Sequence, residues 1–479
     1  MSLLQRALTM RATLSEQHKF LCSHSRYQAH ALDAASHAIG KDEFALAIEF
    51  LEQGRALLWS QMRGFRTPLE QLSEVDGSLA ERFEACNRHL EALITLSESR
   101  ASGSSTSAIV SRGLGPFQDQ RAIDATLAQV RRLSEEQEVL INDIRRIPGF
   151  EDFLMVKPFD TIRQAASEGP VVVLNHSNYR CDALIILARE NDPCICIPLD
   201  KDFHADSNNL HEELIRIRRT LGVGSRAYDE VLRRVMKVLW ERVVSKVVQK
   251  LTELGIEEGS RIWWCPTSVL SAFPFHAAGP YEGRDGGMKY LLDDYISSYT
   301  PTLTSLINAR SGMRNGGDER MLFVADMKLP SAKKERDAIN SVRRFERLLG
   351  KRATPKAVLG LLQEANWVHF VCHGRLDDEP FNSSLKLSGG GLTLLDIARA
   401  NLPNAEFAFL SACHSAEQGP NFALDEALHL AADEGEVRFK RAAAAVQQAA
   451  LILREWGDED PDTGKVMTER WVNLVHIGA

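Results

Sequence analysis

Residues 367–374 read WVHFVCHG, and residues 407–415 read FAFLSACHS. Each stretch begins as an apolar run typical of a buried β-strand and then changes abruptly to small, reactive residues. A His-Gly closes the first stretch, and a Cys follows the apolar part of the second. Because sites in open α/β sheets form outside the carboxyl ends of parallel strands, two such neighbouring strands would bring His373 and Cys413 together.

This pair has the chemistry of a nucleophile and its base. A thiol is mostly protonated at neutral pH, and a neighbouring His that takes the proton produces the reactive thiolate. Gly374 has no Cβ to shield its backbone N–H, so that group and the N–H of Cys413 are candidates to hold the oxyanion of an acyl-transfer intermediate. The sequence therefore predicts covalent catalysis by His373 and Cys413.

Other roles for these residues have to be weighed. Cys413 alone would fit a buried structural cysteine or a redox sensor that is reversibly oxidised. Zinc binding by the two Cys-His pairs, 372–373 and 413–414, is disfavoured because adjacent residues of a strand point to opposite faces. Gly389–Gly391 lacks the Lys-Ser/Thr of a phosphate-binding loop and fits a hairpin tip. We expect no metal and no cofactor.

Strand-like and helix-like segments alternate from residue 171 onward. This alternation is typical of an α/β fold with a mostly parallel sheet and right-handed crossovers. Besides the two quoted strands, the pattern predicts a hairpin over 384–394. The expected strands are 171–175, 183–187, 194–197, 261–265 and 321–325, and the expected helices are 207–255, 334–349, 355–364, 394–400 and 438–455.

The N-terminal part has helical composition. Within residues 1–100, residues 27–62 resemble one TPR-like helix pair with a turn at 40–42 and Asp42 as N-cap, although a plain helical bundle fits equally well. The Ser- and Gly-containing stretch 101–116 is a candidate flexible linker, and 117–160 a helical bridge. Residues 161–479 would form the catalytic domain.

Length and charge narrow the functional class. A chain of 479 residues is expected to form two or three domains. The net charge of −8 argues against a nucleic-acid partner, and no apolar stretch approaches the roughly 18 residues of a membrane span. Eight scattered cysteines without framework spacing favour a reducing compartment. We therefore expect a cytoplasmic protein that does not bind membranes.

The string VHFVCHG followed by LSACHSA resembles the CHAT family of caspase-like cysteine proteases, which often carry TPR repeats. The resemblance covers roughly residues 160–479. It implies a caspase-like three-layer α/β domain and a cysteine endopeptidase with His373 and Cys413 as its dyad, acting on protein substrates. Supporting strings are WWCP at 263–266, FPFHAA at 273–278, DEALHLA at 425–431 and WVNLVHIGA at 471–479.

The resemblance implies two further features. Asp326 stands where caspase-like folds form the primary specificity pocket, and its carboxylate would favour a basic side chain before the scissile bond. The helical N-terminal region would recruit substrate or a regulatory protein.

The chain also departs from the family. After residues 430–432 the family continues into a helix and another strand, whereas here the sequence passes directly to the acidic residues 433–436. Loss of that strand would expose the edge of the Cys strand. The alternative function is therefore an inactive protease fold that serves as a scaffold or interaction module.

Overall fold

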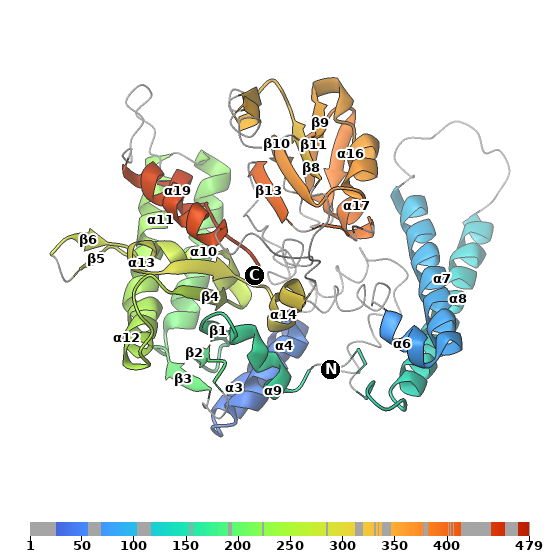
Figure 1. The fold of residues 1–479 in the computed structure, drawn as a ribbon, viewed down its shortest axis with the longest axis horizontal. Coiled ribbons are helices and arrows are strands. Elements are labelled where there is room, and N and C mark those ends of the chain that lie inside the picture. Colours follow the sequence, from blue (N-terminus) through green and yellow to red (C-terminus); the bar gives the residue numbers. More distant parts are fainter. Residues whose placement is uncertain are drawn as a thin grey trace. The chain divides into compact units, whose positions relative to one another are not determined.

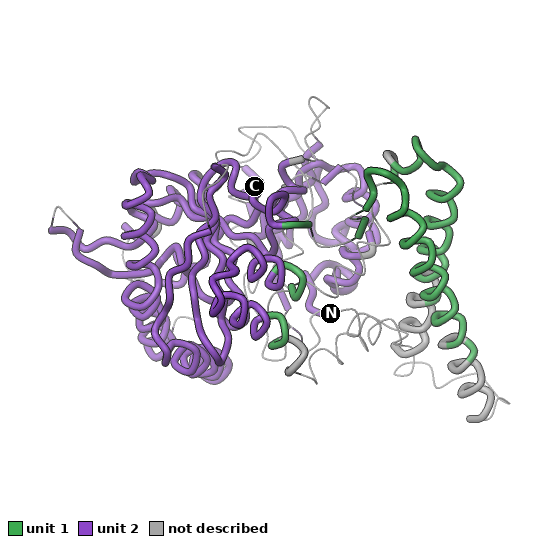
Figure 2. Tube along the Cα trace, turned by 90° about the horizontal axis from the view of Figure 1, so that it is seen from below, with its two compact units in different colours: residues 1–31, 52–158 green, residues 32–51, 159–479 purple. Residues whose placement is uncertain are grey.

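The computed structural model forms two compact units, residues 1–31 with 52–158 and residues 32–51 with 159–479 (Figure 2). All described strands belong to the second unit (Figure 1). The structure describes residues 25–55, 69–102, 116–151, 153–154, 157–189, 194–222, 225–283, 286–311, 320–329, 332–333, 335–337, 346–375, 377, 382–400, 402, 404–405, 407–412, 442–455 and 468–478.

The first unit is built on two long helices, α7 (Gly77–Ser102) and α8 (Pro116–Ile144), with the short helix α6 (Glu70–Val75) against α7. Phe83, Leu140 and Ile144 are fully buried in their shared core. The Cys86 thiol donates to the carbonyl of Leu133 at 3.3 Å, which also ties the two helices together. Of the predicted linker, residues 103–115 lie outside the described part of the chain.

A helix pair is present where the TPR-like pair was predicted: α3 (Ser25–Ile39) and α4 (Phe44–Gly54), joined by a turn at 40–42. A Cβ at Gly54 would lie 2.0 Å from that of Ala31, so the close approach of the helices requires glycine there. The prediction of Asp42 as N-cap is wrong, because Asp42 has φ 61° and Glu43 directly precedes the helix. Whether the pair is TPR-like stays a prediction.

The first sheet of the second unit has the strand order β3-β2-β1-β4-β7. The strands β1 (Val171–His176), β2 (Cys181–Ile186) and β3 (Ile195–Pro198) form an antiparallel meander. The strands β4 (Arg261–Cys265) and β7 (Ile296–Tyr299) continue from β1 in parallel. Every residue of β1 and β2 is buried, including the polar side chains of Asn175, His176 and Asp182 within their otherwise apolar sequences.

Helices pack against this sheet and complete its core. The largest are α10 (Phe203–Leu221), α11 (Arg226–Leu239) and α12 (Ser245–Glu253), with the π-helical turn η3 (Trp240–Val244) between the last two. The smaller elements are α9 (Phe159–Ile162), η2 (Arg163–Ala166), η4 (Ser268–Ala272), η5 (Phe275–Ala277), β5 (Tyr281–Glu282), β6 (Met288–Lys289), α13 (Leu291–Asp294) and α14 (Leu303–Ser311).

The end of the described chain is docked on the same sheet through α19 (Ala442–Glu455) and α20 (Glu469–Val472). Arg454 makes a bidentate ion pair with Asp293 at 2.5 and 2.7 Å. Trp471 is buried, and Ile477 forms a parallel bridge with Tyr299 at the end of β7. This segment therefore extends the first sheet beyond β7.

The second sheet has a parallel part and an antiparallel part. The strands β8 (Met321–Ala325), β9 (Glu346–Leu349), β10 (Trp367–Arg375) and β13 (Phe407–Ala412) run parallel. Beyond its parallel partners, β10 continues into an antiparallel pairing with β11 (Ser384–Leu387), which pairs with β12 (Gly390–Thr393). Beside the strands lie η6 (Gly350–Arg352), α16 (Pro355–Leu362) and α17 (Leu394–Arg399).

The predicted α/β character is confirmed, but the described strands form two mixed sheets and a small antiparallel pair, β5 with β6, instead of one mostly parallel sheet. The helix predicted over 334–349 is wrong at its end, because 346–349 form β9. The strand expected to end at His373-Gly374 continues to Arg375. Cys413, His414 and the residues 425–436 lie outside the described part of the chain. No helix in the described part is long and apolar enough to cross a membrane.

The tight approach of α3 and α4 predicts an unusual response to Gly54→Ala. In most helix interiors this change stabilises by about 0.5–1 kcal/mol, but the clash with Ala31 should instead destabilise by about 1–3 kcal/mol. The matched control is Gly77→Ala in α7, where a Cβ would meet nothing within 4 Å. Urea unfolding of both variants measures the difference. Equal or increased stability of Gly54→Ala would refute the close packing.

Candidate active site

The residues of β10 alternate between the two faces of the second sheet. Phe370 and Cys372 are buried in one apolar cluster with Val358 of α16, and we call this side the α16 face. Val371 is buried on the opposite side with Ala325 and Ala332. His369 and His373 share the parity of Val371, so they belong to this second side, which we call the Glu335 face.

Two contacts of His369 stabilise the Glu335 face of the sheet. Its Nε2 lies 2.8 Å from the carboxylate of Glu335, and its ring stacks on Phe409 of β13 with centroids 4.6 Å apart. Sequence analysis missed this residue, and its one signal was a histidine inside an otherwise apolar strand. The contact attaches the helical residues 335–337 to the sheet directly before the candidate site.

His373 is exposed, four residues further along β10 on the same face. Its neighbour Cys372 is 2 % exposed and faces the α16 core. The expectation that these adjacent residues lie on opposite faces is therefore confirmed, and one metal ion could not take both. His373 thus stands at the solvent end of the Glu335 face, where a substrate can reach it.

The pairing of β10 with β13 ends one residue before the two residues of the predicted dyad. Their last paired residues are Cys372 and Ala412, so the next position on each strand is His373 and residue 413. Cys413 itself lies outside the described residues. Gly374 lies inside β10, opposite Leu385 of β11, and not in a loop.

Asp326 directly follows β8, next to the site strand. Its backbone N–H donates to the carbonyl of Val371 at 2.9 Å, two residues before His373. Its Oδ1 accepts a hydrogen bond from the backbone N–H of Lys328, which orders the turn after the strand. Asp326 is half-buried. The structure therefore places this carboxylate at the same edge of the sheet as His373.

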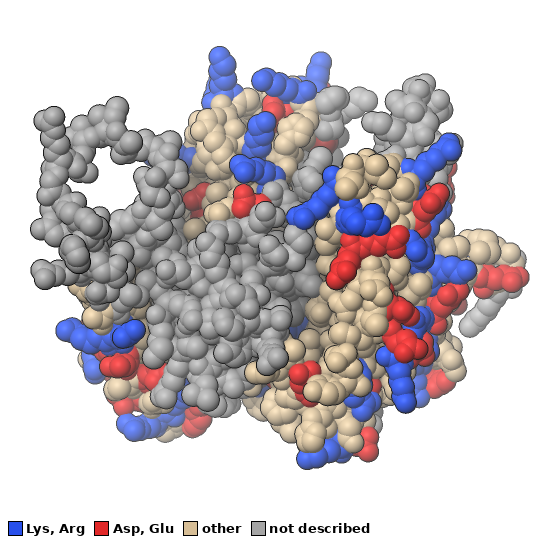
Figure 3. Space-filling model, turned by 180° about the vertical axis from the view of Figure 1, so that it is seen from behind, with Lys and Arg blue, Asp and Glu red and all other residues tan. Residues whose placement is uncertain are grey.

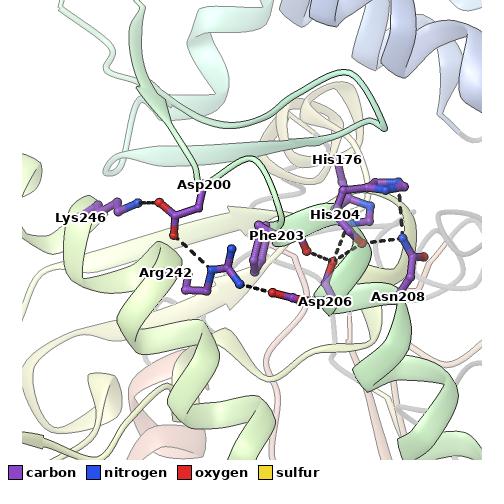
Figure 4. Close-up of polar contacts among 9 residues, drawn as sticks. His176, Asp200, Phe203, His204, Asp206, Asn208, Arg242 and Lys246 are labelled. Carbon is purple, nitrogen blue, oxygen red and sulfur yellow. Dashed lines mark hydrogen bonds and ion pairs between the residues drawn. The ribbon is translucent and has the colours of Figure 1, made fainter.

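A second polar cluster lies at the carboxyl end of β1 in the first sheet (Figure 4). His176 is fully buried, and its Nε2 lies 2.7 Å from the Ser207 hydroxyl of α10. That hydroxyl donates to the carbonyl of Phe203 at 2.6 Å, so His176 donates from Nε2, and its Nδ1 has no hydrogen-bond partner among the described residues. Its ring packs against His204 with centroids 4.5 Å apart.

Burial determines the protonation of this cluster. Desolvation lowers the pKa of His176 to about 3, with smaller contributions from the charges of His204 and His211. Burial also lowers the pKa of His211 to about 4. A serine that already donates to a backbone carbonyl is a poor nucleophile partner, so the cluster is a structural element and not a second catalytic pair.

The start of α10 is held by an ion-pair network beside this cluster (Figure 4). Arg242 of η3 binds Asp206 and also Asp200, the latter at 3.1 Å, and lies over the ring of Phe203. Lys246 adds a second contact to Asp200 at 2.8 Å. These contacts join the π-helical turn to α10 and thereby fix the helix that packs on His176.

The arrangement of the described side chains bears on the binding of metal ions and of nucleic acids. No three of their His, Cys, Asp or Glu side chains are grouped so that they could hold a metal ion. On the face drawn in Figure 3, described basic and acidic side chains are interspersed. That face, as far as it is described, shows no broad basic surface of the kind that binds nucleic-acid phosphates.

The buried histidines predict that acid destabilises the second unit. The unfolded chain binds protons below the ordinary His pKa of 6.5, whereas folded His176 and His211 do not until about pH 3 and 4. Their stabilising effect is therefore complete above pH 6.5 and is lost as the pH falls, by about 1.4 kcal/mol per unit for each group.

Urea unfolding at pH 7.5 and 5.0 tests this expectation. His176→Gln should lower the stability at pH 7.5 but reduce the loss between the two pH values by about 2 kcal/mol relative to the parent. The matched control, His89→Gln, changes an exposed histidine of the first unit and should keep the parental loss. An unchanged pH dependence in His176→Gln would contradict the account.

A comparison with known protein families finds a match for the region around the site. Residues 232–434 match the family model of the CHAT domain. The match begins in α11, includes all strands of the second sheet and extends past Cys413, so it is shorter than the span 160–479 suggested by the motifs. No curated protein matches the chain. Residues 232–434 are therefore similar to a CHAT domain, and this match indicates a caspase-like, protease-related fold for that region.

Proposed function

We propose that the protein is a cysteine endopeptidase in which His373 and Cys413 form a catalytic dyad. The observation that carries this proposal is the register of β10 and β13, in which Cys372 pairs with Ala412. If this register continues for one residue, His373 would lie beside Cys413 at a separation of about 4.8 Å between strands, with both on the Glu335 face. That spacing suits a thiol and the imidazole that takes its proton.

The reaction would proceed by covalent acyl transfer. His373 takes the thiol proton, and the sulfur of Cys413 attacks the peptide carbonyl. The protonated imidazole then gives its proton to the leaving amine, and water releases the acyl group from the sulfur. The backbone N–H groups of Gly374 and Cys413 are the proposed donors to the oxyanion, although the N–H of Gly374 lies within a strand that pairs with β11.

The other parts of the chain would control access to the dyad. The helical N-terminal unit would recruit protein substrates or a regulatory protein in the cytoplasm. Its support is the presence of long helices with their own core, separate from the second unit.

A scaffold without catalysis is the competing proposal, and one observation favours it. Ala408 and Leu410 of β13 are exposed, although Phe370 beside them on β10 is buried. Exposure of the α16 face at these two residues would follow if the helix that the family places after residues 430–432 were missing together with its strand. In this case the fold would present β13 to a partner and cleave nothing.

Labelling and cleavage distinguish the two proposals. We expect a panel of peptidyl electrophiles to label the protein once, at Cys413, and cleavage of matching peptides to fall by at least about 1,000-fold in both Cys413→Ala and His373→Ala. His414→Ala is the matched control and should keep both activities. A folded protein that is neither labelled nor cleaves any peptide would establish the scaffold instead.

Asp326 predicts the preferred residue before the scissile bond. Its half-buried carboxylate would pair with Lys or Arg of the substrate, so Asp326→Ala should reduce kcat/KM for such peptides by about 10–100-fold and spare those with neutral residues. Asp337→Ala removes another carboxylate of the same unit and serves as control. An unchanged peptide profile in Asp326→Ala would assign Asp326 to the turn alone.

A further inference from the structure

The extension of β10 beyond its parallel partners forms a small exposed platform. Within the described residues, 373–375 pair with β11, and β11 pairs with β12. Leu385 and Leu392 of this hairpin are buried in the cluster of the α16 face. By alternation, Lys386 belongs to the Glu335 face together with His373, and both side chains are exposed.

Lys386 is the direct cross-strand partner of His373. Residues paired in this way have Cα atoms about 4.5–5.5 Å apart, and the lysine side chain is long enough to place its ammonium over the neighbouring position. On its other side Lys386 is paired with Gly391, which carries no side chain to cover it. The ammonium therefore has open space on one side and the proposed catalytic histidine on the other.

The charges around Lys386 are not balanced by the hairpin itself. Neither cross-strand neighbour is acidic, and Lys386 makes no ion pair with any described residue. Arg375, two residues after His373 on the same face, is also exposed. Among the described residues, Asp377 is the carboxylate that pairs with Arg375, at 3.5 Å.

Arg375 and Lys386 lie diagonally across the β10–β11 pair, within reach of long side chains, and their like charges repel. Two cations beside one carboxylate therefore leave a surplus of positive charge next to the site, and an incoming anion would remove that repulsion. An acidic side chain is the anion that a peptide substrate brings to this position.

We propose that Lys386, assisted by Arg375, forms a subsite that binds an Asp or Glu side chain of a peptide substrate close to the scissile bond. The consequence for cleavage rests on the proposed peptidase function, but the binding step does not require it. The acidic residue occupies a different position of the peptide from the basic residue assigned to Asp326. Together they define a substrate with a basic residue before the cleaved bond and an acidic residue beside it.

Binding to the full chain carrying Cys413→Ala tests the subsite without turnover. The probes are three pools of fluorescent, amidated hexapeptides that each carry one Arg and differ in one fixed residue, Glu, Gln or Lys, with the other positions mixed and uncharged. Fluorescence anisotropy should show the Glu pool binding at least ten-fold more tightly than the Gln pool. Lys386→Arg should keep this preference, Lys386→Ala should abolish it, and Lys386→Glu should transfer it to the Lys pool.

The matched control is Lys356→Glu, which makes the same charge change at an exposed lysine of α16 and should keep the preference for Glu. Absence of binding, equal binding of the Glu and Gln pools, or a preference that survives Lys386→Glu would overturn the proposal.

Cleavage of the same pools by the chain with Cys413 intact separates the two proposals. A preference for Glu in binding without any cleavage contradicts the peptidase function alone. Cleavage that is indifferent to Glu contradicts the Lys386 subsite alone.

Discussion

The parallel backbone ladder between β10 and β13 is the constraint on which the site depends. It sets Trp367 against Phe407 at one end and Cys372 against Ala412 at the other. Because side chains alternate with a period of two, a shift of one residue would move every histidine of β10 to the α16 face. Two contacts oppose such a shift: the burial of Cys372 on one side and the His369–Phe409 stack on the other.

A polar contact lies between the buried part of the sheet and the exposed end of the site. The His369–Glu335 pair is mostly buried, and it holds residues 335–337 over the Glu335 face. Beyond it the same face opens to solvent at His373, with the β11–β12 hairpin extending the strand. In the proposed function, such a strand end would combine a rigidly held base with an accessible nucleophile, which nucleophilic catalysis requires.

The two sheets illustrate what the sequence could and could not predict. Strands β1, β2, β4 and β8 were predicted within a few residues because each contains a run of apolar residues of strand length. β9 was assigned to a helix, since four residues with two exposed charged side chains carry no strand pattern. The division into two sheets depends on long-range pairing, and the cross-strand position of Lys386 depends on the hairpin register, neither of which periodicity encodes. His373 was found because His-Gly interrupts an apolar strand, whereas His369 resembled an ordinary core position.

The most direct measurement of the central claim is a disulfide between the two strand ends. In His373→Cys, the register predicts Cα atoms about 4.8 Å apart at positions 373 and 413, within the range of about 4.4–6.8 Å that disulfides require. Peptide mapping after mild oxidation should then recover a linked pair from these positions. Arg375→Cys, two residues further along the same face, should give none. Failure of His373→Cys to link, or equal linking by Arg375→Cys, would contradict the register and the dyad built on it.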